Sequence, residues 1–243
     1  MLPWCDYFVD PSATEEQVLR VLSSPARKML RRFSCGMLTN ERIVDKLPKE
    51  YLTELWIRFA PRFTGINEIL KLTRLEKLIL AACNSLTDSL VSKLEGLKFL
   101  ESINLEGNSQ LGDEGIIPIV EGCKRLTEIN LKRVSITGKT LKAVGENLPK
   151  LRSILLSGQC SKSAFLITDE VVIEMLSVCS KVEILHLDFF PSLSLSICEI
   201  FKSYKFTELK EIEFKKFLDA ETINLKMLQT YCPKLYHLNS KTF

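Results

Sequence analysis

Few residues in the chain have side chains suited to catalysis or metal binding. The two histidines, His186 and His237, lie far apart in the sequence, and no His-Glu-x-x-His or Cys-x-x-Cys motif is present. Glycine-rich phosphate loops and the nucleophile elbow of hydrolases are also missing from the sequence. We interpret both histidines as solvated or partner-contacting side chains. The sequence therefore predicts a protein that is not an enzyme, with no catalytic residues, cofactor or metal.

The eight cysteines are the other reactive side chains, and their spacing indicates structural roles. Cys123, Cys179 and Cys232 each lie three residues before the leading apolar residue of a recurring motif. Such equivalent positions stack along an array, where a free thiol packs as a small hydrophobic group. Cys160 lies in an irregular stretch near the basic Lys162, and we interpret it as incidental. We predict reduced core cysteines in an intracellular protein, without a disulfide framework.

The motif that follows these cysteines recurs through most of the chain. It places apolar residues at positions 1, 4 and 6, as in Leu126-Thr-Glu-Ile129-Asn-Leu131. Copies begin at residues 75, 100, 126, 151, 182, 209 and 235, and a weaker copy within Tyr51–Ile57 has Leu52 as its first apolar residue. This regularity indicates a repeat protein, in which each unit packs only against its neighbours.

Each unit combines a short strand with a helix. The alternation of apolar and polar residues has the period of a strand with one buried face. A turn with Thr-Asp or Gly-Asp follows, as at Thr87-Asp88, and predicts a helix start at which a side chain accepts from backbone N–H groups. The helix carries one apolar stripe, such as Ile116, Val120 and Cys123. Stacked units would bury both faces, so we predict an α/β solenoid with a curved parallel sheet inside and helices outside.

Residues 1–50 lack the motif, and we expect them to form a helical N-terminal cap. Thr14-Glu-Glu-Gln17 matches a capping box, and helical patterns follow as far as Leu22 and from Ala26 to Cys35. Such a cap would cover the open edge of the first strand. Residues 51–243 are predicted to form about seven repeats in a single continuous domain.

The overall composition is typical of a soluble globular protein, with 46% hydrophobic and 26% charged residues. The formal net charge of +3 is too small to indicate binding to nucleic acid or to an anionic membrane. No run approaches the ~18 apolar residues of a membrane span. The N-terminal sequence lacks the basic and apolar regions of a secretory signal, and its early acidic residues are untypical of a transit peptide. We expect a cytoplasmic or nuclear protein with no nucleic-acid or membrane partner.

The motif resembles the cysteine-containing subclass of leucine-rich repeats, whose pattern is C-x-x-L-x-x-L-x-L-x-x-C-x-x-I-T-D-x-x-L. Residues 78–88 and 123–131 match it best, and the resemblance covers about residues 51–243. The subclass occurs in F-box/LRR proteins and in shorter antagonist-of-mitotic-exit-network (Amn-type) proteins. The resemblance implies a leucine-rich-repeat horseshoe and a recognition subunit, often a substrate receptor of a cullin-type ubiquitin ligase. Leu47-Pro48 runs directly into the first copy, so no F-box is recognisable in the sequence.

Strand residues that point away from the core are the candidate binding residues. Alternation places positions 3 and 5 of each copy on the concave face. Apolar residues flanked by polar ones on such a face often mark a protein contact. Alternatively, Trp56 packs under the N-terminal cap and Ile184 leans onto the loop at Phe189. The predicted partner-binding residues are Trp56, Ile79, Asn104, Asn130, Leu155, Ile184, His186 and Glu213.

An insertion between strand and helix in the longest copy is a second candidate. Its 31-residue interval contains an extra loop that ends at Phe165, and insertions in repeat proteins often lie on the binding face. Phe165 would either anchor a partner or pack back onto Leu166. The lysines at 202, 205, 210, 215 and 216 form a basic run, which we interpret as a solvated face.

Two functional hypotheses follow from this reading. The first is a non-catalytic protein-interaction module, acting as a substrate-recognition or regulatory subunit in ubiquitin-dependent protein turnover. Its partners would be proteins, cullin-ligase components among them. The second is a structural or assembly factor of an intracellular complex that uses the same surface without any ligase. Recovery of cullin-ligase proteins with the chain distinguishes the first from the second.

Overall fold

The computed structural model describes residues 5–37, 40–158, 164, 166–194, 199–204, 206–214 and 225–239. The strands in these ranges are β1 (Cys5–Phe8), β2 (Leu30–Cys35), β3 (Glu54–Arg58), β4 (Lys77–Ala81), β5 (Ser102–Asn104), β6 (Glu128–Lys132), β7 (Ser153–Ser157), β8 (Ile184–Asp188), β9 (Glu211–Glu213) and β10 (His237–Asn239). The α-helices are α1 (Glu15–Leu22), α2 (Glu41–Asp45), α3 (Ile66–Ile69), α4 (Asp88–Val91), α5 (Asp113–Gly122), α6 (Gly138–Asn147), α7 (Asp169–Val178), α8 (Glu199–Ser203) and α9 (Leu225–Gln229). Two 3-10 helices are η1 (Pro25–Met29) and η2 (Ser92–Gly96).

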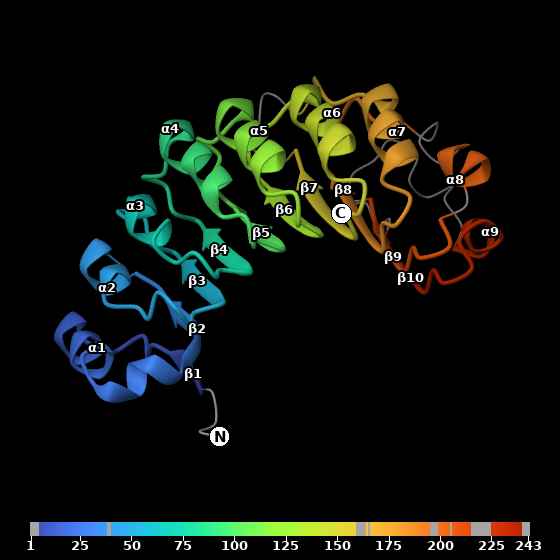
Figure 1. Cartoon of the computed structure of the whole chain (residues 1–243). Helices are drawn as coiled ribbons and strands as arrows, with labels where there is room; N and C mark the ends of the chain where they lie inside the picture. Colours follow the sequence, from blue (N-terminus) through green and yellow to red (C-terminus); the bar gives the residue numbers. More distant parts are fainter. Residues whose placement is uncertain are drawn as a thin grey trace.

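The described strands form one open sheet that curves along its whole length. They lie in the order β1 to β10, and each pairs in parallel with the next strand in the chain. Helices lie on the outer side of the arc and strands line its inner side (Figure 1). The predicted α/β solenoid with a concave parallel sheet and outer helices is therefore confirmed. Among the described helices, none is both long and apolar enough to cross a membrane.

The core lies between the sheet and the helices. In β6, Ile129 and Leu131 are each 1% exposed, whereas Asn130 between them lies on the other face and is half-buried. Helix α5 contributes Ile116 and Val120, which are fully buried. Full burial of one such side chain stabilises the fold by about 1.5–3 kcal/mol. The array therefore depends on many small contributions from every unit.

The N-terminal segment differs from the expected helical cap. Strands β1 and β2 pair with each other and with β3, so the sheet extends through this segment. The stretch from Ala26 to Cys35, predicted as a helix, forms all but the first residue of η1, followed by β2. The spacing of Leu30 and Phe33 fits a helix, but the buried pattern of Leu30, Phe33 and Cys35 repeats positions 1, 4 and 6 of the strand motif. The array of strands therefore begins well before residue 51.

The predicted helix-start signals are found at some helices and not at others. Thr14 Oγ1 accepts a hydrogen bond from Gln17 N at 3.3 Å, and Thr14 N donates to Gln17 Oε1 at 2.7 Å, which confirms the capping box of α1. Thr137 likewise accepts from a backbone N–H in the first turn of α6. Thr87 and Thr168 precede α4 and α7 but make no such bond.

The first aspartates of helices α4 and α5 accept hydrogen bonds from the next repeat unit. Asp113 Oδ1 accepts from Thr137 N at 2.9 Å and from Thr140 Oγ1 at 2.7 Å, and Asp113 Oδ2 accepts from Thr137 Oγ1 at 2.5 Å. Asp88 Oδ1 accepts from Gly112 N at 2.9 Å. Burial raises the pKa of Asp113, but the hydrogen bonds from Thr137 and Thr140 outweigh burial and hold this pKa below its ordinary value. These carboxylates therefore connect neighbouring units.

The cysteines predicted for the core are buried there. Cys123, Cys179 and Cys232 are free and 0% exposed. The Sγ atoms of Cys123 and Cys179 lie 3.4 and 3.5 Å from backbone carbonyl oxygens of the preceding unit. Burial raises the pKa of all three thiols to about 11, so they stay protonated at neutral pH. Cys160 lies outside the described residues.

Replacing Leu131 with aspartate should unfold the array, because the substitution buries a charge between the sheet and the helices. Leu166→Asp is a matched control, since Leu166 is 61% exposed. Thermal unfolding followed by circular dichroism measures both variants. A cooperative transition of Leu131→Asp close to that of the control would show that the buried face of β6 is wrongly assigned.

Asp113→Asn should lower the free energy of unfolding at pH 7 by about 1.5–3 kcal/mol, the range for hydrogen bonds to a charged group. The pKa of Asp113 is lower in the folded than in the unfolded chain. The contribution of the Asp113 carboxylate to stability is therefore fully present above its pKa in the unfolded chain. It is lost as the pH falls through its pKa in the folded chain. Urea unfolding at neutral and acidic pH should show the difference from wild type shrinking on acidification. Glu114→Gln, at an exposed neighbouring carboxylate, is the control, and a pH-independent difference would contradict the assignment.

Candidate partner-binding surface

The predicted contact residues lie on the concave face, and four of them line a single hollow. In β3, Leu55 and Ile57 are buried, and Trp56 between them lies on the opposite, concave side. A hollow of about 240 Å³ extends from β3 to β7. It is lined by Arg58, Lys77, Ile79, Ser102, Ile103, Asn104, Glu128, Ile129, Asn130, Ser153 and Leu155. The structure thus brings together the predicted residues of β4, β5, β6 and β7.

These four residues differ in what they offer a partner. Ile79 is in register with Trp56 on one side and Asn104 on the other, and it is only 4% exposed. The side-chain oxygens of Asn104 and Asn130 accept hydrogen bonds from the backbone N–H two residues further on, at 2.8 and 3.0 Å. Leu155 is partly exposed at the β7 end of the hollow. Leu155 is therefore the apolar group in the hollow that a partner can reach most directly.

The strands that follow carry an ion cluster on the concave face. Lys132 Nζ lies 3.2 Å from Asp188 Oδ2, 3.1 Å from Glu213 Oε2 and 2.8 Å from His186 Nδ1. His186 Nε2 lies 2.8 Å from Glu211 Oε1. The side chains of His186 and Glu213, both predicted contact residues, are 12% and 9% exposed. They are engaged mainly within the chain.

Sequence reasoning missed two members of this cluster, Lys132 and Asp188. Each occupies position 7 of its copy, one step beyond positions 3 and 5 on the same face of the strand. Arg58 was missed for the same reason, since it follows Trp56 by two residues on β3. Extending the alternation by one step finds all three residues.

The ion cluster also contains donor types that bind metals. One donor atom each of His186, Asp188 and Glu213 lies within 4.8 Å of the others. The Lys132 ammonium contacts all three residues and so supplies the cation between them. Burial and the nearby Lys132 lower the pKa of His186 against the opposing effect of Glu211 and Glu213. The geometry is that of a structural ion cluster with a neutral imidazole at neutral pH.

Trp56 is the centre of a second cluster, at the other end of the concave face. Arg32 Cζ and Arg58 Cζ lie 5.1 and 5.3 Å from its ring centroid, and Lys77 Nζ lies 6.0 Å from it. Phe8 packs edge-on, with ring centroids 6.1 Å apart. The indole Nε1 is buried and has no hydrogen-bond partner in the part of the chain that is described. Contact with Phe8 agrees with the alternative in which Trp56 packs against the N-terminal segment.

The remaining candidates lie apart from the hollow. Ile184 is half-buried on β8, in register with Ser153 on β7 and Glu211 on β9. Phe165 lies outside the described residues. Lysines 205, 215 and 216 of the basic run lie outside them as well.

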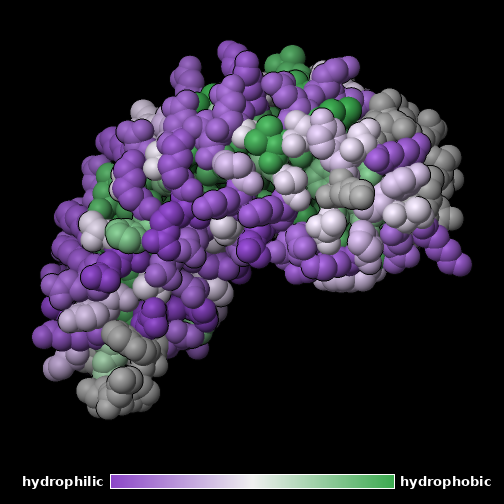
Figure 2. Space-filling model, turned by 45° about the vertical axis from the view of Figure 1, so that its right-hand side comes forward, coloured by the Kyte–Doolittle hydropathy of each residue, from purple (hydrophilic) through white to green (hydrophobic). Residues whose placement is uncertain are grey.

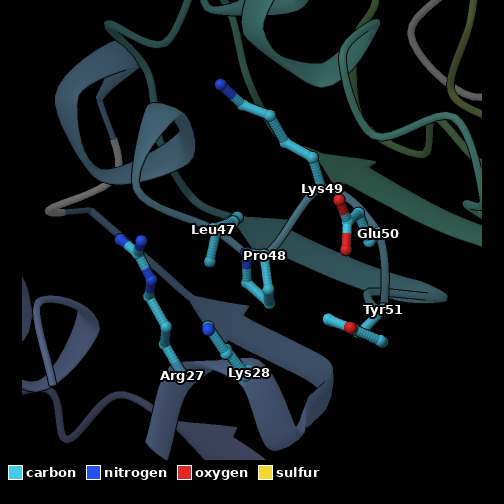
Figure 3. Close-up of a pocket in the computed structure, with 7 residues that line it drawn as sticks. All are labelled: Arg27, Lys28, Leu47, Pro48, Lys49, Glu50 and Tyr51. Atoms are coloured by element: carbon cyan, nitrogen blue, oxygen red, sulfur yellow. The ribbon is translucent and has the colours of Figure 1, made fainter. Parts of the chain in front are cut away.

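Other hollows lie at the two ends of the strands. A hollow of about 350 Å³, near the starts of β2 and β3, is lined by Arg27, Lys28, Leu47, Pro48, Lys49, Glu50 and Tyr51. Its two basic residues from η1 lie across from Glu50 and Tyr51 (Figure 3). A hollow of about 330 Å³ at the opposite ends of β2 and β3 includes Met37 and Phe59, which are 79% and 68% exposed. Figure 2 shows a largely hydrophilic outer side over the N-terminal half and a hollowed underside of the arch.

The curved parallel sheet, its outer helices and the repeated strand motif define a leucine-rich-repeat solenoid. Internalin C2 from Listeria monocytogenes has a similar structure, with a TM-score of 0.62 and 17% identity over 90% of this chain and 83% of its own. A chain of the Rad7 and Elc1 complex in yeast matches with a TM-score of 0.53 and 15% identity, over 95% of this chain and 76% of its own. The internalin InlF from Listeria monocytogenes matches with a TM-score of 0.52 and 17% identity, over 86% of this chain and 52% of its own. No protein-family model and no curated protein matches the sequence.

Lys132→Met should lower the free energy of unfolding by about 3 kcal/mol, because breaking a buried ion pair leaves charge uncompensated. Lys139→Met is the matched control, since Lys139 is exposed on α6. Urea denaturation at neutral pH measures the difference. Equal stability of the two variants would show that the ion cluster does not hold β6, β8 and β9 together.

Proposed function

We propose that this chain is a protein-interaction module that binds a partner protein along its concave face. The observation that carries the proposal is the hollow from β3 to β7, where partly exposed Leu155 lies among amide and charged side chains. Apolar groups surrounded by polar ones are typical of protein contacts. The hollow is built on strands and not on long loops, so little conformational entropy is lost when a partner binds.

In the fuller form of the proposal, the chain is a substrate-recognition or regulatory subunit in ubiquitin-dependent protein turnover. Support comes from the repeat motif, which resembles that of F-box/LRR and Amn-type proteins. One structural neighbour comes from a complex of two proteins, Rad7 and Elc1. We place the protein in the cytoplasm or nucleus, where its buried thiols stay reduced, and include cullin-ligase components among its partners.

Leu155→Asp should abolish recovery of the partner while changing the melting temperature little, because Leu155 is partly exposed on the concave face. The tagged full-length chain is expressed in cells of its own organism and cross-linked, and the co-purified proteins are quantified by mass spectrometry. Val178→Asp is the control, since it adds the same charge at an exposed position of the outer helix α7, away from the hollow.

Loss of the same proteins from both variants, or from neither, would argue against the concave face as the binding surface. Cullin or other ligase subunits among the Leu155-dependent proteins would support the ubiquitin role. Co-migration with one stable complex that lacks ligase subunits would favour the structural or assembly factor. A melting temperature lowered as far as in Leu131→Asp would place Leu155 in the core.

A further inference from the structure

We infer that the concave hollow binds an acidic peptide segment of the partner, with a carboxylate between Arg58 and Lys77 and an apolar side chain on Leu155. This inference rests on the proposed function and names the chemistry of the partner at the same surface. Arg58 and Lys77 line the hollow together with Leu155, although neither was among the residues predicted from the sequence.

Two cationic groups at this end of the hollow keep their charge available. Arg32, the third cation around Trp56, is bound by Glu54 at 2.7 Å and by Asp6 at 3.0 Å. Arg58 and Lys77 form no ion pair with any residue in the described ranges. Two carboxylates lie on the same face, Glu54 in register with Lys77 and Glu128 in the lining of the hollow. Glu54 is bound by Arg32, and Glu128 accepts a hydrogen bond from Ser102 Oγ at 2.9 Å. An anion of the partner next to Arg58 and Lys77 would give these two side chains an ion-pair partner of their own.

The ring of Trp56 positions both cations before a partner arrives. The guanidinium of Arg58 and the ammonium of Lys77 lie within cation–π distance of the ring. A guanidinium stacked on an aromatic face keeps the N–H donors at its edge, which can hold a carboxylate by two parallel hydrogen bonds. Holding the donors in place reduces the entropy lost on binding.

The dimensions of the hollow favour side chains of an extended peptide over a free small molecule. Its volume of about 240 Å³ lies below the ~300–1,000 Å³ of most small-molecule pockets. Lys77 on β4 is in register with Ser153 on β7, three strand spacings of about 4.8 Å away, and Leu155 lies two residues further along β7, so the two are roughly 16 Å apart. An extended peptide advances about 3.3 Å per residue. The geometry points to an Asp or Glu about five residues from a Leu, Ile or Phe.

A random 12-residue peptide library displayed on phage, selected against the full-length chain, tests this inference. Selected peptides should share an acidic residue about five positions from an apolar one. A fluorescein-labelled selected peptide is then titrated by fluorescence anisotropy. For Arg58→Gln/Lys77→Gln the Kd should rise roughly 10- to 100-fold, and added salt should weaken wild-type binding.

The control variant is Arg62→Gln/Lys93→Gln, which removes the same charge at exposed positions outside the hollow and should leave the Kd unchanged. The indole N–H signal of Trp56, assigned with Trp56→Phe, should shift in the NMR spectrum as the peptide is added. Selected peptides without acidic residues, no selected peptide at all, or an unchanged Kd for Arg58→Gln/Lys77→Gln would each overturn the inference.

Leu155→Asp separates failure of this inference from failure of the proposed function. Binding that is lost in Leu155→Asp but kept in Arg58→Gln/Lys77→Gln would overturn the acidic segment and leave the concave binding face standing. Binding that both variants keep would place the peptide elsewhere and count against the concave face as well. Loss in both variants supports the inference.

Discussion

No single unit of this protein can pair its own strand hydrogen bonds or bury its own apolar side chains. This dependence on neighbouring units determines the whole structure. Each parallel strand must find its hydrogen-bond partners in the next unit, because a parallel pair cannot be closed by a tight turn. Asn108 makes the link explicit: its Nδ2 donates to Leu80 O at 2.7 Å and its Oδ1 accepts from Cys83 N at 2.8 Å, both in the preceding unit. Stability is therefore distributed along the array and does not reside in one central core.

The same stacking brings polar side chains close together on the concave face. Two regions of this face differ in how their charged side chains are paired. Around β6 to β9, Lys132 forms ion pairs with both Asp188 and Glu213, so this part of the face is filled by the chain itself. Around β3 to β7, Arg58 and Lys77 form no ion pair within the described residues, although Glu54 lies in register with Lys77 and Glu128 lines the hollow beside them. The ion pairs of Lys132 connect strands of the sheet, whereas cations that form no ion pair beside a hollow are suited to recognition.

The course of the chain could be predicted best where the spacing of apolar residues has one interpretation. The copies that begin at residues 75 to 209 place apolar residues at positions 1, 4 and 6, and their strands have the predicted buried and concave faces. Leu30 and Phe33 show where this reasoning failed, because a gap of three residues fits a helix and the strand motif equally well. The pairing of β2 with β3 decides between the two, and that pairing is not visible locally.

By itself, the sequence determined the repeat, the phase of the strands and the face on which Trp56, Asn130 and Leu155 lie, because alternation is a local property of the backbone. Only the tertiary structure decided which concave residues meet. Lys132 and Glu213 are 81 residues apart in the chain, yet stacking and register place their charged atoms 3.1 Å apart. Stacking also buries Ile79 and leaves Arg58 beside the hollow, since exposure depends on side chains from neighbouring units.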